Sequence, residues 1–117
     1  MGFRVIIAGG RDFTDYPLLH KKCDVFFREK TPSVILSGVA KGADSLGVRY
    51  AKEKGIPVQE YPANWQKLGR RAGMVRNRQM LEDADALVAF WDGKSHGTAN
   101  MISIAKEAGI PVRVVPY

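Results

Sequence analysis

The feature of this sequence that most constrains its fold is a regular alternation of short apolar runs with amphipathic stripes of helical period. The apolar runs, which have the length of buried strands, span residues 3–8, 33–37, 58–61, 86–90 and 112–115. The helical stripes span residues 15–30, 44–54, 72–83 and 97–108. Strands and helices that alternate in this way form right-handed βαβ units and a parallel sheet.

The predicted fold is therefore α/β. We expect a Rossmann-like, doubly wound parallel sheet of about five strands in the order 3-2-1-4-5, with helices on both faces. The 117 residues contain no linker or low-complexity stretch, so we predict a single domain over residues 1–117. In this order the first and fourth strands are neighbours, and a ligand cleft is expected outside their carboxyl ends.

Composition narrows the class of protein. Cys23 is the only cysteine, which excludes an intrachain disulfide and a disulfide-stapled secreted fold. No run approaches the roughly 18 apolar residues of a membrane span, and no basic region precedes the first apolar run. We therefore expect a cytoplasmic protein without a membrane partner. The net charge of +6 favours anionic partners such as phosphates or nucleic acid, although it also serves solubility.

One segment of the chain nearly repeats. Residues 51–58 read AKEKGIPV, and residues 105–112 read AKEAGIPV. In both, a glycine and then a proline follow a helical stripe and precede an apolar run, which is typical of a helix end before a strand. Duplication of a βαβ half and shared turn chemistry both explain the repeat, and we favour the turn chemistry.

Glycine and polar residues concentrate after the strands, at one edge of the predicted sheet, in residues 9–13, 37–44 and 91–98. Glycine lets backbone N–H groups approach a phosphate, and the helices that follow present N-termini that favour anions. We therefore predict an anion site at this edge. The variant Gly42→Val tests this prediction only if the φ of Gly42 is negative, because valine at a positive φ would also impair folding. The candidate ligand-binding residues are Gly9, Gly10, Arg11, Ser37, Gly38, Gly42, Ala43, Asp44, Arg76, Asn77, Trp91, Gly93, Ser95, Gly97 and Thr98.

Several familiar sites are excluded by spacing. Lys41 is followed by Gly42, so the second loop is not a Walker A loop, and no Gly-x-Gly-x-x-Gly fingerprint follows the first strand. His20 and His96 lack metal-ligand spacing, and no Ser-His-Asp arrangement is legible. We expect no metal and no cofactor.

Arg76 lies in a run with four arginines in residues 70–78. The other three are interpreted as a solvent-exposed helix face. Arg76 is one position from the apolar stripe, so we expect it to point into the cleft, where a guanidinium suits phosphate or carboxylate. The alternative is a buried ion pair with Asp83 or Asp85.

Two tryptophans, Trp65 and Trp91, lie in loops at the same edge. Each is suited either to stacking on a nucleobase or to packing in the core. The sequence leaves these two alternatives open.

Five motifs occur in a fixed order: residues 9–13 (GGRDF), 37–44 (SGVAKGAD), 76–80 (RNRQM), 90–93 (FWDG) and 95–98 (SHGT). Together they resemble the SLOG superfamily, specifically its small YspA-like branch, over nearly the whole chain. The superfamily includes Lonely Guy-type phosphoribohydrolases, the DNA-processing protein A family and nucleotide sensors. The resemblance implies a Rossmann-like sheet that binds a nucleotide or nucleotide-derived ligand.

The resemblance to the phosphoribohydrolases also bears on catalysis. Arg76 matches their arginine and Asn77 replaces their lysine, but Met101 stands where they have the catalytic glutamate. A thioether cannot move protons, so turnover is left open. If the chain is an enzyme, we expect hydrolysis of a nucleotide at its N-glycosidic or phosphoester bond, with Asp44 or Asp92 as the base; Asp44 is alternatively a helix cap.

Three functions remain in view. The first is binding of a nucleotide-like small molecule by a sensor, a sequestering protein or a nucleotide-processing enzyme. The second is slow, phosphoribohydrolase-like hydrolysis. The third is a single-stranded DNA-binding module, which the net charge of +6 supports. We also expect a homo-oligomer.

Overall fold

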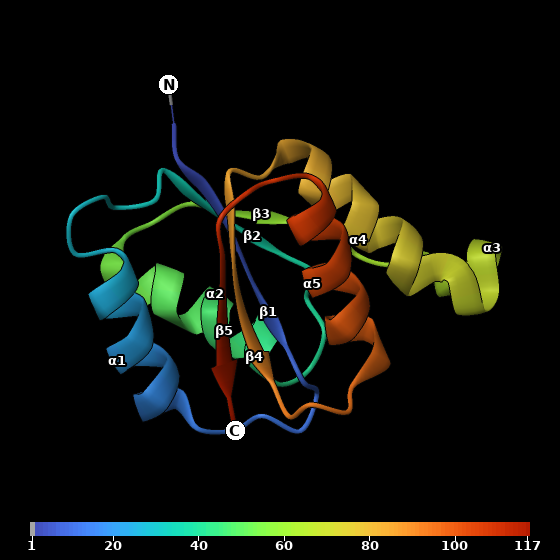
Figure 1. Ribbon diagram of the computed structural model, residues 1–117, viewed down its shortest axis with the longest axis horizontal. Coiled ribbons are helices and arrows are strands. Elements are labelled where there is room, and N and C mark those ends of the chain that lie inside the picture. The colour runs from blue at the N-terminus through green and yellow to red at the C-terminus, as the bar shows by residue number, and fades with distance from the viewer. Residues whose placement is uncertain (1) are drawn as a thin grey trace.

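A computed structural model describes residues 2–117 and contains one five-stranded sheet. The strands are β1 (Arg4–Gly9), β2 (Val34–Ser37), β3 (Val58–Glu60), β4 (Ala86–Trp91) and β5 (Val112–Pro116). They lie in the order β3-β2-β1-β4-β5, and every neighbouring pair is parallel (Figure 1). The predicted fold class and strand order are confirmed.

Four longer helices cover the two faces of this sheet. They are α1 (Tyr16–Phe26), α2 (Ala43–Lys54), α4 (Ala72–Asp83) and α5 (His96–Glu107). Helices α1 and α2 pack on one face, and α4 and α5 pack on the other (Figure 1). Within residues 2–117, no helix is both long and apolar enough to cross a membrane.

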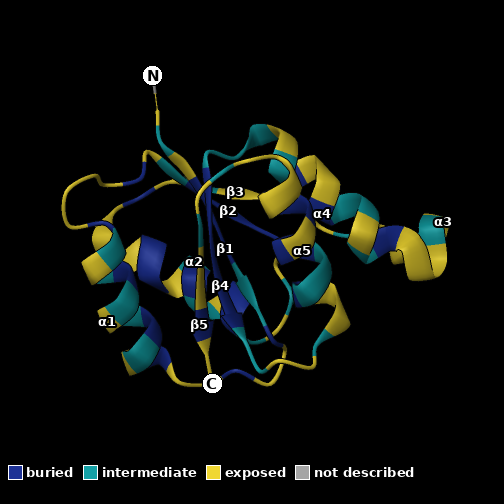
Figure 2. Cartoon of the chain, in the orientation of Figure 1, coloured by how far each residue is buried: buried dark blue, intermediate teal, exposed yellow. Residues whose placement is uncertain are grey.

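The strands supply both halves of the core because their side chains alternate between the faces. On β1, Val5 and Ile7 are fully buried against α1 and α2, and Ile6 is fully buried against α4 and α5. Figure 2 shows the central strands β1, β2 and β4 mostly buried between the helices, whereas the edge strands β3 and β5 are largely exposed or intermediate. Burial on both faces explains why the central strands β1, β2 and β4 read as nearly continuous apolar runs.

The near-repeat forms the same turn twice, at the amino edge of the sheet. Gly55 and Gly109 have φ of 70° and 77°. Their N–H groups donate to carbonyls in the last helical turn, and the N–H groups of Ile56 and Ile110 donate to Ala51 O and Ala105 O. This is the Schellman pattern, so turn chemistry accounts for the repeat without a duplication.

Two sequence expectations need correction. Helix α1 ends at Phe26 rather than near Lys30, and Phe27 is its C-cap residue. The Phe27 ring is nevertheless buried, so the apolar stripe in the sequence continues past the end of the helix. Residues 62–69, expected to be a loop, contain the short helix α3 (Trp65–Leu68), which leads into the 3-10 turn η1 (Gly69–Arg71) and then α4. Asn64 begins α3 because its side chain accepts a hydrogen bond from the Lys67 N–H.

Candidate functional site

The carboxyl edge of the sheet carries a cleft of about 790 Å³, formed by the loops after β1, β2 and β4, by α4 and the turn before it, and by the first half of α5. Ten candidate residues line it: Gly9, Gly10, Arg11, Asp44, Arg76, Asn77, Asp92, Ser95, Gly97 and Thr98. Five candidates, Ser37, Gly42, Ala43, Trp91 and Gly93, line neither this cleft nor the smaller cavity beside it, while Gly38 lines only that cavity. The loops that the sequence grouped together therefore do meet at one place.

Two of the loops are fitted closely to one another through Gly42. This residue has a φ of 79°, and a Cβ there would lie within 3.0 Å of the backbone of Gly10 and Arg11. The next residue, Ala43, donates its N–H to Gly10 O. Glycine is thus required both by backbone conformation and by space, so Gly42→Val cannot separate binding from folding.

Asp44 is the second residue of α2, and its side chain is almost fully buried, with 5% of the residue exposed. Gly42 is the N-cap, so Asp44 is not the helix cap. Its Oδ2 instead accepts the Ala40 N–H at 3.3 Å and so ties down the β2–α2 loop. Burial raises the pKa of Asp44 to about 6, against the opposing effects of the Ala40 hydrogen bond and the Arg76 charge.

Arg76 reaches from α4 across the cleft to the β2–α2 loop. Its Nη1 donates to Gly38 O at 2.7 Å, and its Nε donates to Asn77 Oδ1 at 3.2 Å. A Cβ at Gly38 would lie within 3.0 Å of both the Arg76 guanidinium and the Asp44 carboxylate, so this glycine leaves room for both. Burial lowers the pKa of Arg76 from its ordinary high value, and the charge of Asp44 opposes this.

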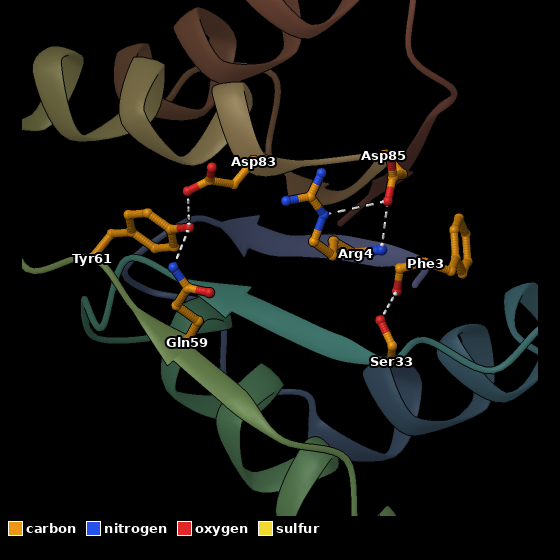
Figure 3. A network of polar contacts seen from close by, with 7 residues as sticks. All are labelled: Phe3, Arg4, Ser33, Gln59, Tyr61, Asp83 and Asp85. Carbon is orange, nitrogen blue, oxygen red and sulfur yellow. Dashed lines mark hydrogen bonds and ion pairs between the residues drawn. The ribbon is translucent and has the colours of Figure 1, made fainter. Parts of the chain in front are cut away.

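The expected alternative for Arg76, an ion pair with Asp83 or Asp85, is wrong. Asp83 accepts a hydrogen bond from Tyr61, and Asp85 binds both the backbone N–H and the guanidinium of Arg4 (Figure 3). Within residues 2–117, no carboxylate forms an ion pair with Arg76. Its charge remains available to a ligand.

Asn77 joins two helices. It is 8% exposed, and its Nδ2 donates to Gly97 O at 3.2 Å and to Asn100 Oδ1 at 3.1 Å. These bonds fix the start of α5 against α4. Asn77 therefore positions the helix N-terminus that faces the cleft.

The β4–α5 loop is held by its own side chains. Asp92 Oδ1 accepts the backbone N–H groups of Lys94 and Ser95 at 2.8 and 2.9 Å, and these bonds lower the pKa of Asp92. Trp91 donates its indole N–H to Ser95 O at 3.0 Å and packs against the α4–α5 side of the core. Of the two alternatives, nucleobase stacking and core packing, Trp91 has the packing role. Trp65, by contrast, is half exposed.

The cleft also contains residues that the sequence did not select. They are Ala8, Asp12, Ala40, Arg70, Gly73, Met74, Met80, His96, Asn100 and Met101. Arg70, interpreted as solvent-facing, is indeed exposed, and it also lines the cleft. Asp12 lay within a quoted motif, but nothing in the motif distinguished it. Its carboxylate accepts a hydrogen bond from the Tyr117 hydroxyl.

Three arginines and three carboxylates line the cleft, and the carboxylates are Asp12, Asp44 and Asp92, so the formal charges of these six side chains balance. Arg11, Arg70 and Arg76 line it, and none forms an ion pair within the described residues. Helix α5 starts at His96, its first N–H groups have no intrahelical acceptor, and Ser95 supplies no side-chain cap bond to them. Residues 2–117 contain no cluster of three His, Cys, Asp or Glu side chains that could hold a metal ion. The guanidinium groups that form no ion pair and the start of α5 are the parts of the cleft suited to an anion.

Known proteins resemble this chain at three levels. A model of the YspA, cpYpsA-related SLOG family matches residues 3–68. Gene 61 protein of Mycobacterium phage D29 is 34% identical over an alignment of 116 residues, and the match covers 93% of each chain. The solved structure of DNA processing protein A (DprA) from Streptococcus pneumoniae has a TM-score of 0.73 at 18% identity, and the match covers all of this chain but 51% of that one.

These similarities differ in what they establish. At 18% identity, the likeness to DprA concerns the fold alone, and this chain spans about half of that protein. The family model, by contrast, matches more than half of this chain, and the phage protein is similar over nearly all of it. The chain belongs to the YspA, cpYpsA-related SLOG family.

Proposed function

We propose that this protein binds a nucleotide in the cleft at the carboxyl edge of its sheet, with the nucleotide's phosphate beside Arg76. The observation that carries the proposal is that Arg76 is half-buried, is held in place by Gly38 and Asn77, and has no carboxylate in ion-pair contact within residues 2–117. A fixed guanidinium that forms no ion pair is an efficient phosphate ligand, although the nearby Asp44 carboxylate offsets part of its charge. Family membership supports a nucleotide-related role.

The phosphate would lie between Arg76 and the start of α5. The N–H groups of residues 96–98 lack intrahelical acceptors, and the dipole of α5 favours negative charge at this end. Arg11 lines the cleft from the β1–α1 loop. These three elements come from different parts of the chain, and we propose that all three contact the phosphate.

The nucleoside would occupy the remainder of the cleft. A volume of about 790 Å³ falls in the range of small-molecule sites. Met80 and Met101, each 1% exposed, line it together with Met74. Thioethers adapt to flat apolar surfaces, so this side of the cleft is suited to a nucleobase.

Binding without turnover is the form of the function that we favour. Met101 supplies no proton, and Asp92 is a weak base because backbone hydrogen bonds lower its pKa. One observation favours a second candidate, slow hydrolysis: the pKa of Asp44 is about 6, which is near the optimum for a general base. That carboxylate is 5% exposed, however, and is engaged by Ala40.

Calorimetric titration with a nucleoside monophosphate tests the proposal. We expect Arg76→Gln to weaken binding by ten- to hundredfold, because a charged hydrogen-bonded pair contributes about 1.5–3 kcal/mol. The matched control is Arg78→Gln, since Arg78 is exposed on the same helix and lines neither cavity. Equal affinity for wild type and a folded Arg76→Gln variant would contradict the proposal.

A second variant keeps the test valid if the loss of the Arg76–Gly38 bond unfolds the loop. Arg11 is exposed and makes no ion pair within the described chain, so Arg11→Gln should fold normally. We expect it to weaken binding about tenfold. Release of base or phosphate at ordinary enzyme rates, about 1–10³ s⁻¹, would instead show that turnover is the function.

A further inference from the structure

A second cavity of about 370 Å³ adjoins the main cleft. It lies between the β2–α2 loop and the segment that leads from β3 into α3. Arg11, Ala40 and Arg76 line both cavities, so the two spaces meet at these residues. A ligand bound beside Arg76 in the main cleft therefore has a direct continuation into the second cavity.

The outer wall of this cavity is an exposed aromatic face. Trp65 is 50% exposed, and the helix that carries it, α3, has no buried residue. Figure 2 shows α3 standing away from the sheet, with exposed and intermediate residues only. A four-residue helix that buries nothing contributes little to the core, so its tryptophan is free to serve a ligand.

The charges around the cavity are positive. Arg11, Lys41 and Arg76 line it, no carboxylate does, and none of the three forms an ion pair within residues 2–117. The Arg11 guanidinium lies 5.8 Å from the centre of the Trp65 ring. A cation beside an aromatic face is the combination with which proteins bind the phosphate and base of single-stranded nucleic acid.

From this arrangement we propose that the ligand is a dinucleotide unit rather than a mononucleotide. The first nucleotide occupies the main cleft, the linking phosphate lies between Arg11 and Arg76, and the second base stacks on Trp65. Lys41 faces the second unit. The inference rests on the proposed function, because it extends the same phosphate site. The unit is either a free dinucleotide or part of a longer strand, since both present the same chemistry.

The test compares two ligands on the same protein. We expect the 5′-phosphorylated dinucleotide pApA to bind at least tenfold more tightly than AMP, because one stacked base changes affinity by this order. Trp65→Ala should remove this advantage and leave the affinity for AMP unchanged. Trp65→Phe, which keeps an aromatic face, should restore most of it.

A charge variant supplies a matched control. Lys41→Gln should weaken pApA binding and change no other property. Lys67→Gln, on α3 but outside both cavities, should leave pApA binding unchanged. A twelve-nucleotide strand identifies the source of the unit. Tighter binding than pApA with the same dependence on Trp65 points to a strand, and equal binding points to a free dinucleotide.

The outcomes separate the two proposals. If AMP binds but pApA binds no more tightly, or if Trp65→Ala leaves the pApA advantage intact, the dinucleotide inference is wrong and the proposed nucleotide site stands. If neither AMP nor pApA binds, the proposed function itself fails. If the twelve-nucleotide strand binds wild type and Trp65→Ala equally tightly, the inference is also wrong.

Discussion

The two edges of the sheet use glycine for different purposes. At the amino edge, Gly55 and Gly109 have positive φ, and a Cβ at either would meet nothing within 4 Å. At the carboxyl edge, Gly42 also has positive φ, but a Cβ there would collide with the backbone of the β1–α1 loop. The amino-edge glycines serve only the turn in which they lie, whereas Gly42 lets two loops approach and form one wall of the cleft.

This difference explains why the chain repeats itself at one edge only. A Schellman turn depends on local residues, so the same short sequence recurs wherever a helix must end before a strand. The cleft loops depend on one another, and each has its own sequence because each has different neighbours. An isolated glycine therefore indicates a turn, whereas glycines that meet across loops indicate a built site.

The largest effect should come from the carboxyl-edge glycine. We expect Gly42→Ala to lower the free energy of unfolding by at least about 3 kcal/mol, because positive φ and the collision with Gly10 and Arg11 act together. Urea unfolding followed by circular dichroism measures this change. A loss no greater than that of an amino-edge variant would show that the two edges are equivalent and would break the comparison.

The next effect concerns two carboxyl groups at the carboxyl edge, Asp44 and Asp92, whose pKa values are shifted in opposite directions. Asp44 has a pKa raised from 3.8 to about 6, so the folded state binds more protons than the unfolded state between these values. Its contribution to the free energy of unfolding therefore falls as pH rises from about 4 to 6 and remains lost above that. This change in the pKa of Asp44 corresponds to about 3 kcal/mol in the free energy of unfolding.

Asp44→Asn removes this titration. We expect the stability of this variant relative to wild type to rise by about 3 kcal/mol between pH 4 and pH 7, measured by urea unfolding at each pH. Asp92→Asn is the matched control, because the pKa of Asp92 is lowered from 3.8, so its contribution is present between pH 4 and pH 7 and is lost only as pH falls further; relative to wild type this variant should change little across that range. A difference between Asp44→Asn and wild type that does not change with pH would refute the buried-carboxylate account.

Much of this fold could be predicted because its signals are local. Continuous apolar runs predict strands that are buried on both faces, and the parallel order follows from βαβ connections. The position of Arg76 beside a buried stripe indicated correctly that it turns toward the cleft. Helix α3 was missed because its four residues bury nothing and so leave no periodic pattern.

The rest of the site depends on contacts between distant segments. The hydrogen-bond acceptor of the Arg76 guanidinium is a backbone carbonyl, Gly38 O, and a backbone acceptor cannot be predicted from residue type. The place of the exposed Arg70 beside the cleft and the cavity beside Trp65 arise from how η1, α3 and the β2–α2 loop pack together. The pKa of Asp44 likewise depends on burial, which its place in a polar motif did not suggest.

The smallest effects should come from the amino edge. We expect Gly55→Ala and Gly109→Ala each to cost about 1–2 kcal/mol, the usual penalty for an L residue in the left-handed region, since no neighbour is displaced. Nucleotide affinity should stay within twofold of wild type in both variants, measured by calorimetry. A tenfold loss of affinity would mean that the amino edge is coupled to the cleft.

The most direct test of the central claim is the titration of ¹⁵N-labelled protein with a nucleoside monophosphate, followed by amide chemical shifts. The account predicts saturable shifts that are largest for residues 9–12 and 96–98, whose backbones line the cleft or begin α5, and negligible shifts at Gly55 and Gly109. In Arg76→Gln the same shifts should need at least tenfold more nucleotide. Saturable shifts centred on the amino edge, or no saturable shifts at any residue, would contradict the account.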